Sequence, residues 1–269
     1  MNAKLPSISL VLLALIILIT FLLPLIIMLE PFKFNADAIL EAPSLEHILG
    51  TDRLGRDIFA RIVYGGQISL IIGFGSALIA SFIGIAMGVS AGYFQGNFDK
   101  TFVIIVDLFL TFPTFFLLLA LISYVDASIL VLIIVISITG WMGTSRLIRQ
   151  ESYNISKQPY IKVLKIADVS KLVIIFKYFL PLVAPIFFIS FTFALSGAIL
   201  AESGLSYLGL GITPPQMSWG SMLSEGKGVM EIAWWVSFFP GLMIFLVTFS
   251  LVQMSDYLQN ITNQKESFN

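Results

Sequence analysis

Few residues of this 269-residue chain have side chains suited to catalysis. There is no cysteine, which excludes disulfides, thiolate metal sites and thiol nucleophiles. The single histidine, His47, cannot build a histidine-rich metal site and gives no convincing partner to the many serines. No GxxxxGK[ST] loop is present to hold a nucleotide phosphate. The sequence therefore predicts a non-enzymatic protein with no metal or cofactor of its own, which cannot power any process by hydrolysing ATP.

Basic side chains gather in residues 146–181, between two long apolar segments. Seven basic residues stand there against Glu151 and Asp168: Arg146, Arg149, Lys157, Lys162, Lys165, Lys171 and Lys177. Pro159 can open a helix, because its missing N–H costs nothing in a first turn. Apolar residues then recur at helical spacing from Tyr160 to Ala167. The pattern predicts a short amphipathic helix that either rests on anionic lipid or docks a partner.

A second charged stretch, residues 47–61, reads HILGTDRLGRDIFAR. Its candidate contact residues are Gly50, Asp52, Arg53, Gly55, Arg56 and Asp57. The glycines permit turns that other residues resist. The acids can cap helices or pair with the arginines, but exposed pairs contribute only about 0–1 kcal/mol. We therefore expect this loop to meet a partner protein rather than to stabilise the fold, with a self-contained surface loop as the alternative.

Composition places these stretches in a membrane protein. The chain is 58% hydrophobic and 12% charged, with a mean hydropathy of +0.96. The net charge of −1 gives no electrostatic case for nucleic acid. Six apolar stretches approach or exceed the roughly 20 residues that cross a bilayer core: 7–29, 68–92, 101–124, 129–148, 182–201 and 232–255. The first lacks a cleavage site and is expected to be retained.

Small residues recur every four positions in the second predicted span: Ser76, Ala80, Gly84, Gly88 and Gly92. Such a stripe lets another helix approach closely where lipid removes the hydrophobic drive for packing. We expect a helix contact, either within this chain or with another subunit. The loops on the side of residues 146–181 carry more Lys and Arg than those on the other side, which predicts that this side and both termini are cytoplasmic.

Several motifs give the chain a family resemblance. The segment HILGTDRLGRDIFARIVYGGQISLIIGF at 47–74 resembles the signature after the first span in permease subunits of the dipeptide/oligopeptide/nickel ABC importers. Matching pieces follow in order: SAGYFQGNFDK (90–100), DLFLTFP (107–113), GWMGTSRLIRQE (140–151), AESGLSYLGLGITPPQMSWGSML (201–223) and FFPGLMIFLVTFSLVQMSDYLQ (238–259). The chain is most similar to the second, C-type permease of the usual pair.

The resemblance implies an all-α membrane protein of the type I ABC importer permease fold, with six transmembrane helices and both termini in the cytoplasm of a bacterial cell. Residues 1–66 would form the first span and an extracytoplasmic loop. Residues 67–260 would form a five-helix permease domain, whose coupling loop at 146–181 lies between helices 4 and 5. Residues 261–269 would be a cytoplasmic tail.

The resemblance also assigns the basic helix to docking. In such permeases a coupling helix, in the EAA loop, seats in a groove of the ATPase subunit. The matching residues here are Ser156, Pro159, Tyr160, Ile161, Lys162, Val163, Leu164, Lys165, Ala167 and Asp168. Lys162 replaces the family's glutamate, Val163 and Leu164 replace its two alanines, and Asp168 replaces its glycine. These departures predict a specialised ATPase partner.

The function implied is import of short peptides, nickel or a small metal chelate of the metallophore or opine kind. A solute-binding protein would deliver the substrate, and a second homologous permease, two cytoplasmic ATPase subunits that bind ATP and Mg²⁺, and membrane lipid would be the other partners. A metal would travel inside a chelator, since this chain has no thiol and one His. Two alternatives are a membrane scaffold and a secondary transporter, although the latter usually shows intramembrane ionisable pairs.

Overall fold

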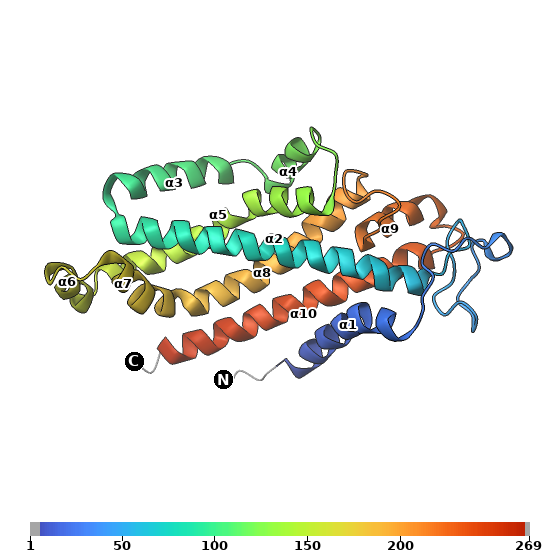
Figure 1. The fold of residues 1–269 in the computed structure, drawn as a ribbon, viewed down its shortest axis with the longest axis horizontal. Helices are drawn as coiled ribbons and strands as arrows, with labels where there is room; N and C mark the ends of the chain where they lie inside the picture. The colour runs from blue at the N-terminus through green and yellow to red at the C-terminus, as the bar shows by residue number, and fades with distance from the viewer. Residues whose placement is uncertain (1–5, 267–269) are drawn as a thin grey trace.

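The computed structural model describes residues 6–266, which form a bundle of helices (Figure 1). The long helices are α1 (Ser7–Ile26), α2 (Ile58–Phe94), α5 (Ile129–Ser156), α8 (Leu180–Tyr207) and α10 (Trp235–Glu266). The shorter ones are η1 (Ala36–Ala38), α3 (Gly96–Leu110), α4 (Thr114–Ile122), α6 (Pro159–Ile166), α7 (Lys171–Ile174), the π-helical turn η2 (Ile175–Phe179), α9 (Trp219–Gly226) and η3 (Lys227–Val229). Within this range the only strand-like pairing is one isolated bridge, Thr51 with Asp57.

Five helical segments of the described chain are long and apolar enough to cross a membrane. They are α1, α2, α5, the continuous run Lys171–Tyr207 that contains α8, and α10. The bent pair α3–α4 makes a sixth if it counts as one span. The predicted all-α membrane fold is confirmed.

The third predicted span, 101–124, is not one straight helix. It is divided between α3 and α4, whose axes differ by 82°. The break lies at Thr111–Pro113, where Pro113 has the non-helical angles φ −58° and ψ 120°. Proline disfavours the helical conformation in the residue before it and supplies no backbone donor. The prediction missed this break because Pro113 interrupts the geometry of the stretch without interrupting its hydropathy.

Helix α2 begins at Ile58, ten residues before the predicted start at 68. The Asp57 side chain caps it by accepting a 2.8 Å hydrogen bond from the Ala60 N–H. The predicted boundary between residues 66 and 67 falls inside this helix. With 37 residues, α2 is about 55 Å long at 1.5 Å per residue. It exceeds the roughly 30 Å hydrocarbon core, so it extends beyond the core.

The predicted loop 146–181 is mostly helix. Helix α5 continues to Ser156, and a continuous helical run starts again at Lys171, so only residues 157–170 connect the two. Arg146 on α5 pairs with Asp107 of α3, and Arg149 donates to Asp99 of α3, with 2.7 Å between Arg149 Nη2 and Asp99 Oδ2. These two arginines therefore attach α3 to α5 instead of lying in a loop.

The long helices pack lengthwise. Helix α2 lies along α5 and also contacts α8, α10 packs on α8, and α1 packs on α10 and α2 (Figure 1). One end of the bundle carries α6, and the other carries residues 27–57 and α9 (Figure 1). We refer to these as the α6 end and the loop end.

Candidate functional site

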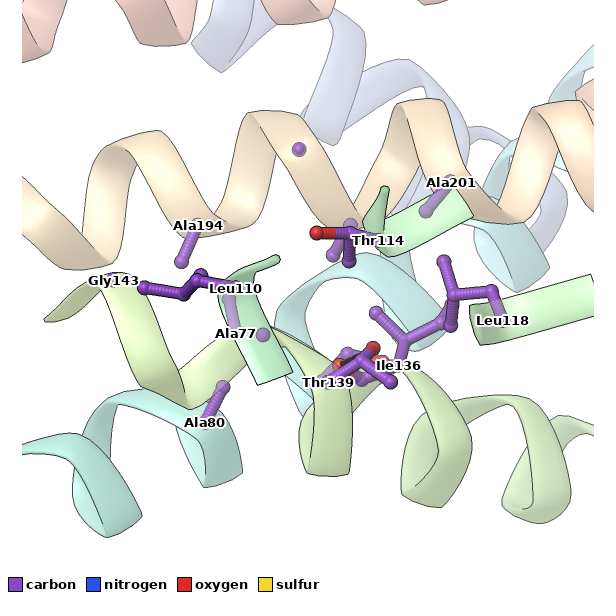
Figure 2. A pocket seen from close by; sticks show the side chains of 14 residues that line it. Ala77, Ala80, Leu110, Thr114, Leu118, Ile136, Thr139, Gly143, Ala194 and Ala201 are labelled. Atoms are coloured by element: carbon purple, nitrogen blue, oxygen red, sulfur yellow. Dashed lines mark hydrogen bonds between the residues drawn. The ribbon is translucent and has the colours of Figure 1, made fainter. Parts of the chain in front are cut away.

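A cavity of about 320 Å³ lies in the bundle between α2, α5, α8 and the broken pair α3–α4. Figure 2 shows Leu110 and Thr114, on either side of the break in α3–α4, extending between α8 and the pair α2–α5. The cavity is lined by Ser76, Ala77, Ala80, Leu110, Thr114, Leu118, Ile136, Thr139, Gly140, Gly143, Ala194, Gly197, Ala198 and Ala201. The bend at Pro113 therefore shapes this cavity.

The lining is made of small and weakly polar groups. Ala77 and Ala80 come from α2, and Ala194 and Ala201 come from α8 (Figure 2). Three hydroxyl side chains contribute polar groups: Ser76, Thr114 and Thr139. None of the lining residues is charged. Such a surface can accommodate a solute without binding it tightly.

Sequence patterns alone did not predict this cavity. Its signal on α8 is a run of small residues, Ala194, Gly197, Ala198 and Ala201, at helical spacing. The two hydroxyls Thr114 and Thr139 carry no local signal, because they line one cavity only after α4 has folded back toward α5. The face of a span that lines a cavity looks like a packing face when only the sequence is known.

The predicted small-residue stripe divides between two environments. Ser76 and Ala80 line the cavity. Gly84, Gly88 and Gly92 lie against α5, in the half of α2 nearer the α6 end. A Cβ built on Gly88 would lie 2.7 Å from the Ser145 carbonyl oxygen and 3.0 Å from the Arg149 nitrogen. The backbones of α2 and α5 approach so closely there that no side chain fits at Gly88.

Helix α6 presents one buried side chain and several exposed ones. Ile161 has no exposed surface and packs in a cluster that includes Val89, Tyr93 and Phe179. Lys162 and Val163 are exposed, and Lys165 Nζ lies 4.4 Å from the centre of the Tyr93 ring. Partial burial lowers the pKa of Lys165. Ile161 therefore anchors α6 to the bundle and leaves the exposed residues for contacts outside this chain.

The other predicted docking residues lie around this anchor. Tyr160, Ala167 and Asp168 are exposed, Pro159 occupies the first helical position and Leu164 is partly buried. Ser156 is buried and donates a 2.9 Å hydrogen bond to the Gly92 carbonyl oxygen, so it belongs to the α2–α5 contact.

The structure explains one departure from the family pattern. Asp168, which stands where the resemblance places a glycine, has a φ of +54°. Glycine adopts this left-handed conformation freely, and Asp and Asn are the other residues that tolerate it best. The backbone turn after α6 can therefore form although the glycine is missing.

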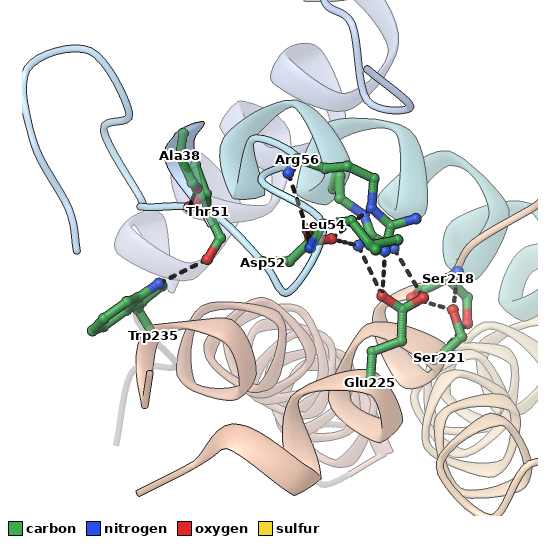
Figure 3. Close-up of polar contacts among 10 residues, drawn as sticks. Ala38, Thr51, Asp52, Leu54, Arg56, Ser218, Ser221, Glu225 and Trp235 are labelled. Atoms are coloured by element: carbon green, nitrogen blue, oxygen red, sulfur yellow. Dashed lines mark hydrogen bonds and ion pairs between the residues drawn. The ribbon is translucent and has the colours of Figure 1, made fainter. Parts of the chain in front are cut away.

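The loop end contains a buried ionic network rather than surface pairs (Figure 3). The Asp52 carboxylate accepts a 2.6 Å hydrogen bond from Arg56 Nε and another from Arg61. Glu225, on α9, accepts from Arg61 Nη2 at 3.0 Å and from Arg56 Nη2 at 2.9 Å. The Arg61 and Asp52 side chains are only 2% and 3% exposed. The expectation of exposed, weakly stabilising pairs in this loop is therefore wrong for Asp52 and Arg56.

The remaining predicted loop residues have separate roles. Gly50 and Gly55 have φ values of +77° and +68°, and a Cβ on either would collide with backbone atoms of Glu41 or Asn35. Asp57 caps α2, and its Oδ2 lies 2.9 Å from His47 Nδ1. Arg53 is exposed. Of the six predicted contact residues, Arg53 has the most exposed side chain, whereas Arg56 and Asp57 are partly buried.

Comparison with known proteins identifies relatives over most of the chain. A family model described as "Binding-protein-dependent transport system inner membrane component" matches residues 84–265. A putative peptide transport system permease protein of Brucella suis biovar 1 is 30% identical over 96% of this chain and 87% of its own length. The dipeptide transport system permease protein of Bacillus subtilis is 34% identical, over 83% of this chain and 70% of its own.

Two further matches extend the comparison. The glutathione transport system permease protein of Pectobacterium atrosepticum is 33% identical over 86% of this chain and 77% of its own length. Among solved structures, the MetNI methionine ABC transporter in an inward-facing conformation aligns with a TM-score of 0.55, covering 73% of this chain and 95% of that one. Its sequence identity of 17% supports a shared fold alone.

Proposed function

The chain belongs to the family of binding-protein-dependent transport system inner membrane components, and on that premise we propose that it lines the path by which an ATP-driven importer admits short peptides. It is a permease subunit of an ABC importer of the inner membrane, a class that works with an ATPase and a solute-binding protein. The observation that carries the proposal is the cavity between α2, α5, α8 and α3–α4.

The cavity suits a substrate that must pass without being held. A short peptide presents amide and carbonyl groups, which the hydroxyls of Thr114 and Thr139 can meet by hydrogen bonding. The uncharged lining offers no fixed partner that would trap a charged terminus. The curated relatives described above are named for peptides, a dipeptide and glutathione, which favours peptides over nickel or a metal chelate as substrate.

We expect a second, homologous permease to cover the open side of α3–α4 and complete the path as a heterodimer. Only Phe102 and Val106 of α3 are buried, whereas Ile104, Leu108 and Phe116 of the bent pair are 60–68% exposed. An apolar surface of this kind in a membrane protein contacts either lipid or another subunit. The second permease and the surrounding membrane lipid would together cover this apolar surface.

Filling the cavity should block uptake. Gly197 lines the cavity and a Cβ there would have nothing within 4 Å, so Gly197→Leu directs its side chain into the cavity. We expect ATP-dependent peptide uptake to fall at least tenfold while the complex still assembles. The matched control is Ala86→Leu, which adds a similar volume at an exposed position of α2 outside the cavity. Normal uptake in Gly197→Leu proteoliposomes would remove the cavity from the path.

We propose that helix α6 docks an ATPase subunit that binds ATP and Mg²⁺, so that the α6 end faces the cytoplasm, and we expect both chain termini on the same side. Because this chain has no cysteine, single cysteines can be introduced as unique crosslinking sites. Val163→Cys and Lys162→Cys are exposed and should crosslink to the ATPase. Ile161→Cys, with a buried side chain, should not crosslink and serves as the control. Crosslinking at Ile161 but not at the two exposed positions would contradict this docking mode.

A further inference from the structure

A buried carboxylate in α8 has no role in the path described above. Glu202 has no exposed surface. Serine hydroxyls surround its carboxyl group: Ser206 donates to Oε1 at 2.7 Å, Ser69 to Oε2 at 3.0 Å and Ser203 to Oε2 at 3.4 Å, and the Ser218 hydroxyl also interacts with it. A buried carboxyl is costly unless it is hydrogen-bonded, so these hydroxyls are needed to keep it there.

Two of the serines connect Glu202 to the segment that leads into α9. The Trp219 N–H donates to Ser69 Oγ at 3.1 Å, and the Ile212 N–H donates to Ser206 Oγ at 3.2 Å. Each hydroxyl thus accepts from a backbone N–H and donates its own hydrogen to Glu202. The first N–H groups of a helix lack partners within it, and Trp219 is the first residue of α9. Glu202 therefore holds the start of α9 to both α2 and α8.

Steric fit reinforces this attachment. Trp219 has no exposed surface, and its Nε1 donates a 2.9 Å hydrogen bond to the Ile62 carbonyl oxygen of α2. A Cβ on Gly220 would lie 2.7 Å from the Ser203 carbonyl oxygen of α8. Near the far end of α9, Glu225 binds Arg61 and Arg56 at the start of α2 (Figure 3). Helix α9 is thus attached to α2 at both of its ends.

The opposite end of α2 contributes to the buried cluster that holds Ile161 of α6. Tyr93 packs edge-on against Phe179 with 5.4 Å between ring centres and belongs to the same buried cluster as Ile161. Lys165 of α6 lies over the Tyr93 ring. One uninterrupted helix therefore connects α6 to α9 across the bundle (Figure 1).

We propose that Glu202 is a positioning residue that makes α9 move as one body with α2, so that displacement of α6 reaches the loop end through a single helix. The displacement of α6 rests on the proposed ATPase docking, whereas the attachment of α9 does not. Removing the shared acceptor would leave the Ser69 and Ser206 hydroxyls without their partner. The start of α9 would then be held less rigidly to α2 and α8, although Trp219 Nε1 and Glu225 still contact α2, and more ATP would be consumed for each opening of the path.

The test is a distance distribution between spin labels at Lys227→Cys, just after α9, and Ile71→Cys on α2, both exposed. It is measured by pulsed electron paramagnetic resonance in the assembled complex, nucleotide-free and trapped with ATP and vanadate. We expect one narrow distribution that is the same in both states. Glu202→Ala should broaden it and raise the ATP consumed per peptide imported, whereas Glu202→Gln, which keeps the size and one of the two acceptor oxygens, should restore both in part.

Two further variants complete the test. Ser69→Ala removes one of the two hydroxyls that link Glu202 to a backbone N–H, and it should broaden the distribution even if Glu202→Ala does not fold. Ser196 is buried on α8 and is not one of the serines that contact Glu202, so Ser196→Ala should change neither readout. A distribution that shifts between states in the unsubstituted chain, or Glu202→Gln as broad as Glu202→Ala, would overturn the proposal. If the ATPase does not dock at α6, the proposed function fails, and the nucleotide-free comparison of the Glu202 variants still tests the attachment.

Discussion

Replacing Arg61 with alanine is expected to destabilise the folded subunit by about 3–5 kcal/mol, the range for breaking a buried ion pair by removing one partner. Arg61 is 2% exposed and donates to both Asp52 and Glu225. Without it, the two carboxylates share only Arg56, and the buried site carries an uncompensated negative charge. The measurement is the loss of folded protein on thermal or denaturant unfolding in detergent.

The matched control for Arg61→Ala is Lys33→Ala. Lys33 pairs with Glu30 at 2.5 Å, but the two side chains are 68% and 57% exposed. Exposed pairs of this kind contribute about 0–1 kcal/mol. Arg61→Met combined with Glu225→Gln should cost less than the sum of the two single changes, because the residues share one network. Equal stability of Arg61→Ala and Lys33→Ala would show that the network does not hold the loop end together.

Replacing Gly92 with alanine is expected to destabilise the subunit by about 1–3 kcal/mol, as overpacking does in a filled interior. A Cβ there would lie 2.8 Å from the Ser152 carbonyl carbon and 2.8 Å from the Tyr153 nitrogen. Both are backbone atoms of α5, so only a shift of the whole helix would make room. The measurement is thermal unfolding of the purified subunit or complex in detergent.

Gly143→Ala is the control for Gly92→Ala and should have the opposite sign. A Cβ at Gly143, on α5, would have nothing within 4 Å. Glycine in a helix interior is less favourable than alanine by about 0.8–1.0 kcal/mol, so this change should be neutral or stabilising. If both changes altered stability in the same direction by the same amount, Gly92 would not be required for the close approach of α2 and α5.

Hydropathy was enough to predict the membrane spans because long apolar runs have few alternatives to crossing a bilayer. It failed where a helix continues through polar residues, as α2 does from Ile58 and α5 does to Ser156. It also failed at Pro113, where an apolar stretch bends. The boundaries of the helices depend on caps such as Asp57, which a hydropathy average does not register.

The site was less predictable than the spans because its parts come from distant segments. Whether Asp52 is exposed depends on Glu225 and Arg61, and Glu225 follows Arg61 by 164 residues. Local charge density alone could not show that these groups are buried together. The amphipathic pattern of α6 did predict a short helix, yet only the packing around Tyr93 shows that Ile161 faces the bundle and Val163 faces outward.

The central claim is tested most directly by uptake into proteoliposomes that contain this subunit with its second permease, ATPase subunits and binding protein. We expect labelled di- or tripeptides to accumulate only with ATP on the α6 side, and we expect Gly197→Leu to lower this accumulation at least tenfold while Ala86→Leu preserves it. Accumulation of a nickel chelate but no peptide would contradict the substrate, and peptide accumulation unaffected by Gly197→Leu would contradict the path.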